Sequence, residues 1–250
     1  MKKKLTLQRV LTRLFDVQLI SARELPLAFE RDHLRKFFSE FKIDVVFDVG
    51  ANEGQYARML REKVGYDGII ISYEPNPKCA QTLKLRAAMD PLWFVEEAAI
   101  DNDVGSREFN VYQSNQFSSF HRPSKIGAQN FERHMTLESQ VQVRTTTLAA
   151  ELEKYASERN ISRPFLKMDT QGHDLIVAKS SGRCLEKFVG LQSELALTEL
   201  YEGSGNYFDS IEYYRAQGFS LSALVPNNLG HFPRLYEMDC IMFNERYFGQ

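Results

Sequence analysis

The 250-residue sequence predicts an α/β fold: a mostly parallel sheet of seven strands with helices on both faces. Two observations support this prediction. From residue 43 onward, short apolar runs alternate with amphipathic stretches, as in parallel strands joined by crossover helices. In addition, VVFDVGANEGQY at 45–56 predicts a strand, a glycine turn and the start of a helix. Sheets of this kind use such a turn to build a nucleotide pocket at the carboxyl end of a strand.

The periodicity places each element in turn. We expect strands near residues 44–49, 69–74, 92–98, 164–168, 190–196, 219–225 and 238–244. Helices are expected near residues 54–63, 76–88, 147–159, 173–180 and 207–217. Right-handed crossovers would bring the loops that follow the parallel strands to one edge of the sheet, where a ligand binds.

Two segments fall outside this alternation. Residues 1–41 are an N-terminal extension with two amphipathic helical patterns, over 7–15 and 27–41. We expect a packing arm against the sheet or a partner subunit, or alternatively a basic helix that contacts a membrane surface. Residues 101–147 hold the strand-like runs REFNVYQ and VQVRTTTL around a polar stretch, which predicts an insertion that acts as a substrate loop. This insertion belongs to a single domain over 42–250.

The composition gives no support for several classes of protein. A net charge of -2, from 31 basic and 33 acidic residues, gives no support for a nucleic-acid partner, and none is expected. Three widely spaced cysteines predict reduced thiols and no zinc site. No run of 18 apolar residues is present, so no membrane-spanning helix is expected. We therefore expect a cytoplasmic protein, with peripheral contact to the inner membrane face if residues 1–41 bind lipid.

The glycine turn favours S-adenosylmethionine as the ligand. Gly50 and Gly54 allow a sharp turn and close approach of the backbone. Asp48 adds a carboxylate at the strand end, which suits a ligand with an ammonium, a sulfonium and ribose hydroxyls and would repel the pyrophosphate of a dinucleotide. Asn52 stands where dinucleotide-binding turns carry their middle glycine.

The next two strand ends supply further cofactor candidates. Glu74 lies 24 positions after Gly50, at the tip of the neighbouring strand, where it can accept hydrogen bonds from the two ribose hydroxyls. After the third strand, small residues such as Ala99 leave room for a flat adenine, and Glu97 or Asp101 can accept from its exocyclic amine.

Catalytic candidates follow the fourth strand. Lys167 and Asp169 lie where FLKMDTQGHDL leaves the sheet, so they are expected at the same edge as the cofactor. Asp169 can orient the methyl donor or accept a substrate proton, and His173 is a second general-base candidate. Glu194 ends the fifth strand, and with Asp169 it offers two oxygen ligands for a divalent cation, so metal dependence is a hypothesis without a committed site.

These segments together resemble the FkbM family of S-adenosylmethionine-dependent methyltransferases. The resemblance rests on VVFDVGANEGQYA (45–57), YEPNP (73–77), LKMDTQGHDL (166–175) and LQSELALTELYEG (191–203), followed by GF at 218–219. It implies a class I methyltransferase fold, which is Rossmann-like, and methyl transfer to a hydroxyl oxygen of a sugar, glycan or polyketide-type acceptor. By position, it implies cofactor contacts from Asp48, Gly50, Asn52, Gly54 and Glu74, and makes Asp169 the fourth-strand acid. Gln171 stands where other members carry glutamate, so no carboxylate role transfers to it.

Two other functions compete with this one. An NAD-dependent oxidoreductase would use the same glycine turn and Glu74. A non-catalytic scaffold or membrane-associated module would keep the fold and bind through residues 1–41. Three acids directed to one cleft, Asp48, Glu74 and Asp169, argue against a scaffold.

Overall fold

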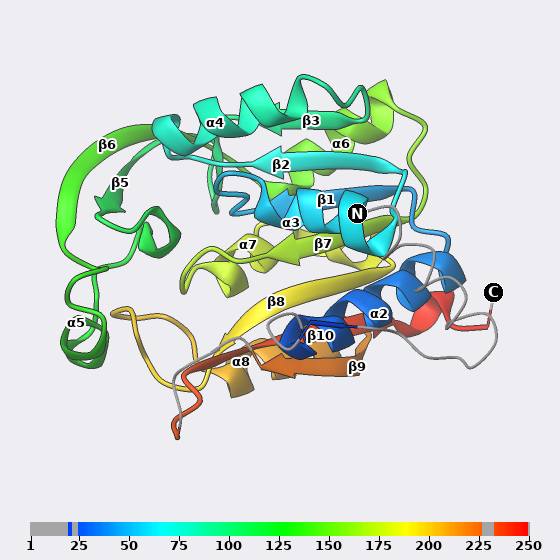
Figure 1. Cartoon of the computed structure of the whole chain (residues 1–250). Coiled ribbons are helices and arrows are strands. Elements are labelled where there is room, and N and C mark those ends of the chain that lie inside the picture. The colour runs from blue at the N-terminus through cyan, green and yellow to red at the C-terminus, as the bar shows by residue number, and fades with distance from the viewer. Residues whose placement is uncertain (1–19, 22–24, 227–232, 250) are drawn as a thin grey trace.

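The structure, a computed structural model, describes residues 20–21, 25–226 and 233–249. Its centre is a seven-stranded sheet in the order β3-β2-β1-β7-β8-β10-β9 (Figure 1). Strand β10 runs antiparallel to β8 and β9, whereas the other neighbours pair in parallel. The seven strands are β1 (Val45–Val49), β2 (Ile69–Tyr73), β3 (Trp93–Glu96), β7 (Pro164–Met168), β8 (Gly190–Ala196), β9 (Phe219–Pro226) and β10 (Glu237–Asn244). The predicted fold class is therefore confirmed.

Helices cover both faces of this sheet because its central strands are apolar on both sides. In β1, Phe47 packs in a core with α6 (Leu148–Glu158), α7 (Asp174–Lys179) and α8 (Tyr207–Ala216). The next residue towards the amino end, Val46, packs in the opposite core with α2 (Leu25–Glu40), α3 (Gln55–Met59) and α4 (Pro77–Ala87). Strands buried on both faces are typical of parallel sheets.

Some predicted boundaries differ from those observed. The helix expected at 54–63 is α3 followed by a π-helical turn over Leu60–Val64. The strand expected at 92–98 ends at Glu96, and the following β4 (Ala99–Ile100) belongs to a second sheet. Short 3₁₀ helices occur at Asn115–Phe117, Gly182–Lys187 and Glu245–Tyr247.

The insertion at 101–147 contains a small sheet of its own. Strand β6 (Leu137–Thr146) pairs with β4 in parallel and with β5 (Gly105–Tyr112) in antiparallel. The two strand-like runs of the sequence are thus strands, and the polar stretch between them holds α5 (Lys125–Asn130). In Figure 1 these elements project from the end of the main sheet at which the parallel strands finish.

Helix α2 packs against the protein's own sheet. Its residues Leu34, Phe37 and Phe38 are buried, and the ring centroids of Phe37 and Phe165 lie 5.5 Å apart. Leu27 does not join this core. The first helix predicted in the extension lies outside the described residues, so its contact with lipid stays a prediction. Within the described ranges, no helix has the length and apolar character to cross a bilayer.

Candidate active site

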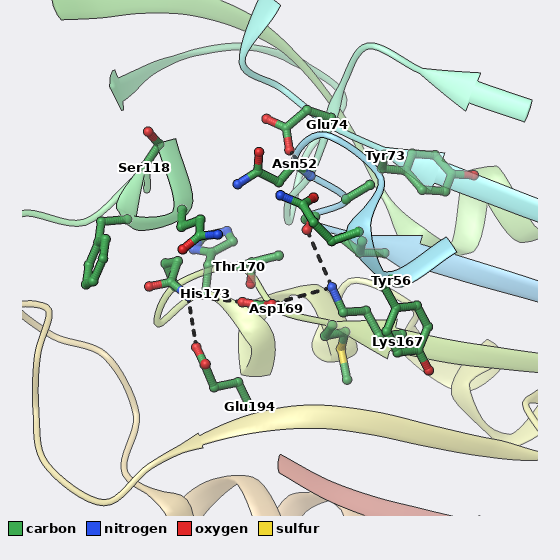
Figure 2. A pocket seen from close by; sticks show the side chains of 18 of the residues that line it. Asn52, Tyr56, Tyr73, Glu74, Ser118, Lys167, Asp169, Thr170, His173 and Glu194 are labelled. Atoms are coloured by element: carbon green, nitrogen blue, oxygen red, sulfur yellow. Dashed lines mark hydrogen bonds and ion pairs between the residues drawn. The ribbon is translucent and has the colours of Figure 1, made fainter. Parts of the chain in front are cut away.

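A cavity of about 600 Å³ opens at the carboxyl ends of β1, β2 and β7. Its size lies within the range of about 300–1,000 Å³ that is typical of small-molecule sites. One side, the glycine-turn half, is formed by Gly50, Asn52, Glu74, Ala98 and Ala99. The other side, the acidic half, is formed by Glu30, Glu194, Glu237 and Asp239. Figure 2 shows Asn52 and Glu74 on one side of the cavity, Glu194 on the other, and Lys167 and Asp169 between them.

The two glycines of the turn have different roles. Both have positive φ, +79° at Gly50 and +85° at Gly54. A Cβ at Gly50 would lie 1.9 Å from the backbone oxygen of Asp169, so this glycine lets the β1 and β7 loops meet at the cavity. A Cβ at Gly54 would lie 2.8 Å from the ring of Trp93, outside the cavity lining. Gly54 therefore serves the packing of α3, and Gly50 shapes the cavity.

The Glu74 carboxylate is held in place by backbone N–H groups. Asn52 N–H donates to one carboxylate oxygen at 2.7 Å, and Asn76 N–H donates to the other at 2.8 Å. Burial raises the pKa of Glu74 to about 7, although these two N–H groups act to lower it. Asn52 adopts a left-handed backbone, with φ of 49°, which turns its N–H towards Glu74. The predicted ribose acid thus lines the cavity in a fixed orientation.

Asp48 lies below the cavity. It is completely buried and outside the cavity lining. Its Oδ1 lies 3.4 Å from Nζ of Lys167, its register partner in the adjacent strand, and its Oδ2 accepts from the Ser72 hydroxyl at 3.1 Å. Burial raises the pKa of Asp48, although Lys167 and Ser72 oppose this effect. This geometry directs Asp48 towards Lys167 and gives it no contact surface for a ligand in the cavity.

The candidates after the third strand separate into two groups. Ala98 and Ala99 line the cavity. Glu97 lies outside the lining, where its half-exposed side chain accepts from Nζ of Lys84 at 2.6 Å. The chain leaves the main sheet after Glu96, which turns Glu97 away from the adenine position that the sequence suggested.

Lys167 and Asp169 lie next to each other at the carboxyl end of β7. Nζ of Lys167 lies 3.6 Å from Oδ2 of Asp169, and it also lies 5.2 Å from the ring centroid of Tyr56 (Figure 2). Burial would lower the pKa of the Lys167 ammonium, but Asp169 and Asp48 raise it. The two carboxylates therefore favour the charged form of Lys167, which lies within ion-pair distance of Asp169.

His173 also lines the cavity, but both of its ring nitrogens are engaged. Its Nε2 lies 3.1 Å from Oδ1 of Asp101, and its Nδ1 lies 3.1 Å from Nε2 of His121. Asp101 is also paired with Arg107 at 2.8 Å. Direct proton acceptance by His173 would require one of these contacts to open, so the geometry favours Asp169 over His173 as the base.

The sequence interpretation missed most of the acidic half. Glu30 comes from α2, and Glu237 and Asp239 come from β10. Burial raises the pKa of Glu30, Glu194 and Asp239, and it raises the pKa of Glu237 to about 8. A usable signal was the spacing of Glu237 and Asp239, since residues two apart in a strand share one face.

The structure brings Asp169 and Glu194 together without forming a metal-binding cluster. The side-chain amide of Gln171 donates to both carboxylates, at 3.0 Å and 3.1 Å. Across the part of the chain that the structure describes, no group of three or more His, Cys, Asp or Glu residues could hold a metal ion.

The fold and the cavity define an α/β protein with a nucleotide-type pocket at the switch point of its sheet, between β1 and β7. A family model described as the methyltransferase FkbM domain matches residues 48–221, which is more than two thirds of the chain. The chain therefore belongs to the FkbM family of S-adenosylmethionine-dependent methyltransferases, and the predicted membership is confirmed. The sequence left three functions open: a methyltransferase, an NAD-dependent oxidoreductase and a non-catalytic scaffold. The family match selects the methyltransferase.

Solved structures with a similar fold share little sequence with this chain. A methyltransferase FkbM from Methylobacillus flagellatus KT is 13% identical, with a TM-score of 0.46; the match covers 80% of this chain and 43% of that one. Magnesium protoporphyrin IX methyltransferase from Synechocystis PCC 6803, with bound SAM, is 8% identical, with 98% of each chain covered and a TM-score of 0.47. Aeropyrum pernix fibrillarin, with natively bound S-adenosyl-L-methionine, is 13% identical, with 80% and 66% covered and a TM-score of 0.44. No curated protein matches the chain significantly.

Proposed function

We propose that the protein transfers a methyl group from S-adenosylmethionine to a hydroxyl oxygen of a small-molecule or glycan acceptor, such as a sugar or a polyketide-like compound. The observation that carries the proposal is the division of one cavity into a glycine-turn half and an acidic half, with Lys167 and Asp169 between them.

The glycine-turn half fits S-adenosylmethionine. Each Glu74 oxygen accepts one N–H and keeps a second lone pair for a ribose hydroxyl. Ala98 and Ala99 offer a flat apolar surface for adenine, and Gly50 leaves the turn without a side chain. When bound, the cofactor supplies a methyl group on a positively charged sulfur.

Asp169 is the residue that we assign to the proton of the acceptor. A hydroxyl oxygen that becomes methylated loses its proton, and a positioned base typically contributes about 10²- to 10⁴-fold to such a step. The Asp169 side chain is 41% exposed towards the cavity and is oriented by Lys167 and Gln171. Lys167 acts as a positioning residue for Asp169, while His173 contributes a wall of the cavity.

The aromatic residues that line the cavity support a hydroxylated acceptor. Phe117, Phe131 and Tyr236 line the cavity near the insertion and the start of β10. Aromatic side chains can pack on the C–H faces of a sugar ring, while carboxylates accept hydrogen bonds from its hydroxyls. Both kinds of group are present in the same cavity.

The test is a transfer assay with methyl-labelled S-adenosylmethionine and a panel of sugars, glycosides and hydroxylated polyketide-type compounds. We expect a labelled product that survives mild base, because a methyl ether is stable to base and a methyl ester is not. We also expect Asp169→Asn to lower this turnover strongly. A labelled product that mild base hydrolyses, as it does a methyl ester, would contradict the proposal.

A cytoplasmic location is part of the same proposal. Cys79, Cys184 and Cys240 are free cysteines, which suits a reducing compartment. Peripheral membrane contact through residues 1–41 can be tested by sedimentation with anionic vesicles, and failure of the full chain to sediment would remove that part.

A further inference from the structure

Gln171 has an unusual backbone conformation directly beside the proposed base. Its φ is +54°, a left-handed value that residues with a side chain adopt uncommonly. Gly172 follows with φ of +87°, so two left-handed residues turn the chain out of β7 into α7. Such conformations persist where the surrounding structure determines them, and they cluster at functional sites.

Hydrogen bonds fix both the backbone and the side chain of Gln171. Its backbone oxygen accepts from the Ser119 hydroxyl at 2.8 Å, and its side-chain oxygen accepts from the Tyr201 hydroxyl at 2.8 Å. Its side-chain nitrogen donates to Oδ1 of Asp169 at 3.0 Å and to Oε2 of Glu194 at 3.1 Å. Ser119 is completely buried and Tyr201 almost completely, so buried partners hold Gln171 in place.

The partners also determine which way the amide points. Its nitrogen faces two carboxylates, and its oxygen faces a hydroxyl that can donate. The opposite orientation would place the amide oxygen against two carboxylate groups and lose both hydrogen bonds. The two N–H bonds of one NH₂ group are therefore directed at the two acids.

We propose that Gln171 is a second positioning residue of the methyl-transfer site, beside Lys167, and that its NH₂ group occupies the place that a divalent cation would take between Asp169 and Glu194. The amide is neutral, so it fixes the two carboxylates without neutralising Asp169. This inference rests on the proposed function for the role of Asp169, but the contacts of Gln171 are independent of the acceptor. It predicts that a third carboxylate at position 171 would create a cation site that the natural sequence lacks.

The first test measures cation binding and needs no methyl transfer. Isothermal titration with Mn²⁺, on the full chain without cofactor, should show no binding to the wild type at this pair and one bound ion in Gln171→Glu. Gln140→Glu, at an exposed position in β6, is the control and should bind none. Mn²⁺ binding by the wild type that Glu194→Gln abolishes, or no binding by a folded Gln171→Glu variant, would overturn the proposal.

The second test separates positioning from folding. Gln171→Gly removes the side chain at a backbone conformation that glycine adopts readily, so the thermal midpoint should change little. Turnover should nevertheless fall by roughly 10²-fold, with KM for the donor nearly unchanged, because Asp169 loses its fixed orientation. Wild-type turnover in this variant would overturn the proposal. Wild-type protein without transfer to any hydroxyl would instead refute the proposed function, while the Mn²⁺ titration would still report on Gln171.

Discussion

The two halves of the cavity are built in different ways. The glycine-turn half is made by three successive strand ends, and its key contact joins the backbone of Asn52 to Glu74. The acidic half is made by side chains from α2, β8 and β10. The first construction depends on local turns at one sheet edge, whereas the second depends on contacts between distant segments. We infer that the donor site follows from the local turns of the fold, whereas the acceptor site depends on contacts that are particular to this sequence.

The largest effect is expected from Gly50→Ala in the glycine-turn half. The added Cβ would meet a backbone oxygen at 1.9 Å, so the turn must move. We expect S-adenosylhomocysteine binding to be abolished and the free energy of unfolding to fall by about 4 kcal/mol or more. Calorimetry and denaturant unfolding measure both.

Gly65→Ala is the matched control for Gly50→Ala. Gly65 has nearly the same φ, +80°, but a Cβ there would have no atom within 4 Å. We expect only the left-handed strain, about 1 kcal/mol, and normal ligand binding. Equal losses in both variants would mean that backbone strain, and not closeness to the β7 loop, explains the glycine.

The next effect is expected from Asp169→Asn at the boundary of the two halves. Turnover should fall by about 10²- to 10⁴-fold, because the proton acceptor is lost. The affinity for S-adenosylhomocysteine should stay within a few-fold of wild type, since Asp169 lies outside the glycine-turn half. Steady-state kinetics and calorimetry on the same preparation separate the two quantities; a variant that loses affinity and keeps turnover would reverse our assignment.

Glu74→Gln should weaken S-adenosylhomocysteine binding by roughly 10- to 100-fold, as expected for a lost charge-assisted hydrogen bond. The wild type should also bind more tightly as pH rises. Burial raises the pKa of Glu74 to about 7, so its carboxylate is the minor form at pH 6 and the major form at pH 8. If the ionised form binds, affinity should rise by about tenfold between these values and should not do so in Glu74→Gln.

The stability of the ligand-free protein should follow the opposite sign. Glu74 has a raised pKa, so the stability linked to its protonated form is present below pH 4.5 and is lost as pH rises through about 7.

Glu97→Gln is the control for the binding measurements on Glu74→Gln, because Glu97 is paired with Lys84 away from the cavity. If Glu97→Gln weakened binding as much as Glu74→Gln, the predicted adenine contact of Glu97 would be restored.

The smallest effect is expected from Glu30→Gln in α2. Oε1 of Glu30 accepts from the Gln192 amide at 2.8 Å, and Gln192 in turn contacts Asp239 at 3.2 Å. We expect a change of a few-fold in KM for the acceptor and none in donor affinity, with Asp32→Asn on the exposed side of the same helix as control. A loss of donor affinity would show that α2 belongs to the glycine-turn half.

The sequence was sufficient for the sheet and for most of the glycine-turn half. Apolar periodicity and strand-end glycines are local signals, and they located the strands, Gly50, Asn52 and Glu74. The same reasoning predicted a ligand contact for Asp48, because the strand end was known but its register partner was not. Lys167 lies directly opposite Asp48 in the adjacent strand and forms an ion pair with its carboxylate.

The acidic half was harder to predict because its residues have no common motif. Glu30 comes from a helix whose pattern predicted only packing, and the role of Gln171 depends on Ser119 and Tyr201, which lie 52 and 30 residues away. Glu97 lies outside the cavity lining for a simpler reason, because β3 ends two residues earlier than expected. The outcomes for Glu30 and Gln171 depend on tertiary contacts that no local spacing encodes.

A crystal structure of the complex with S-adenosylhomocysteine would test the division of the cavity most directly. We predict that the two ribose hydroxyls lie within hydrogen-bond distance of Glu74 and that the sulfur points towards Asp169, which leaves the acidic half open for the acceptor. A ribose bound among Glu194, Glu237 and Asp239, with Glu74 free of the ligand, would contradict the account.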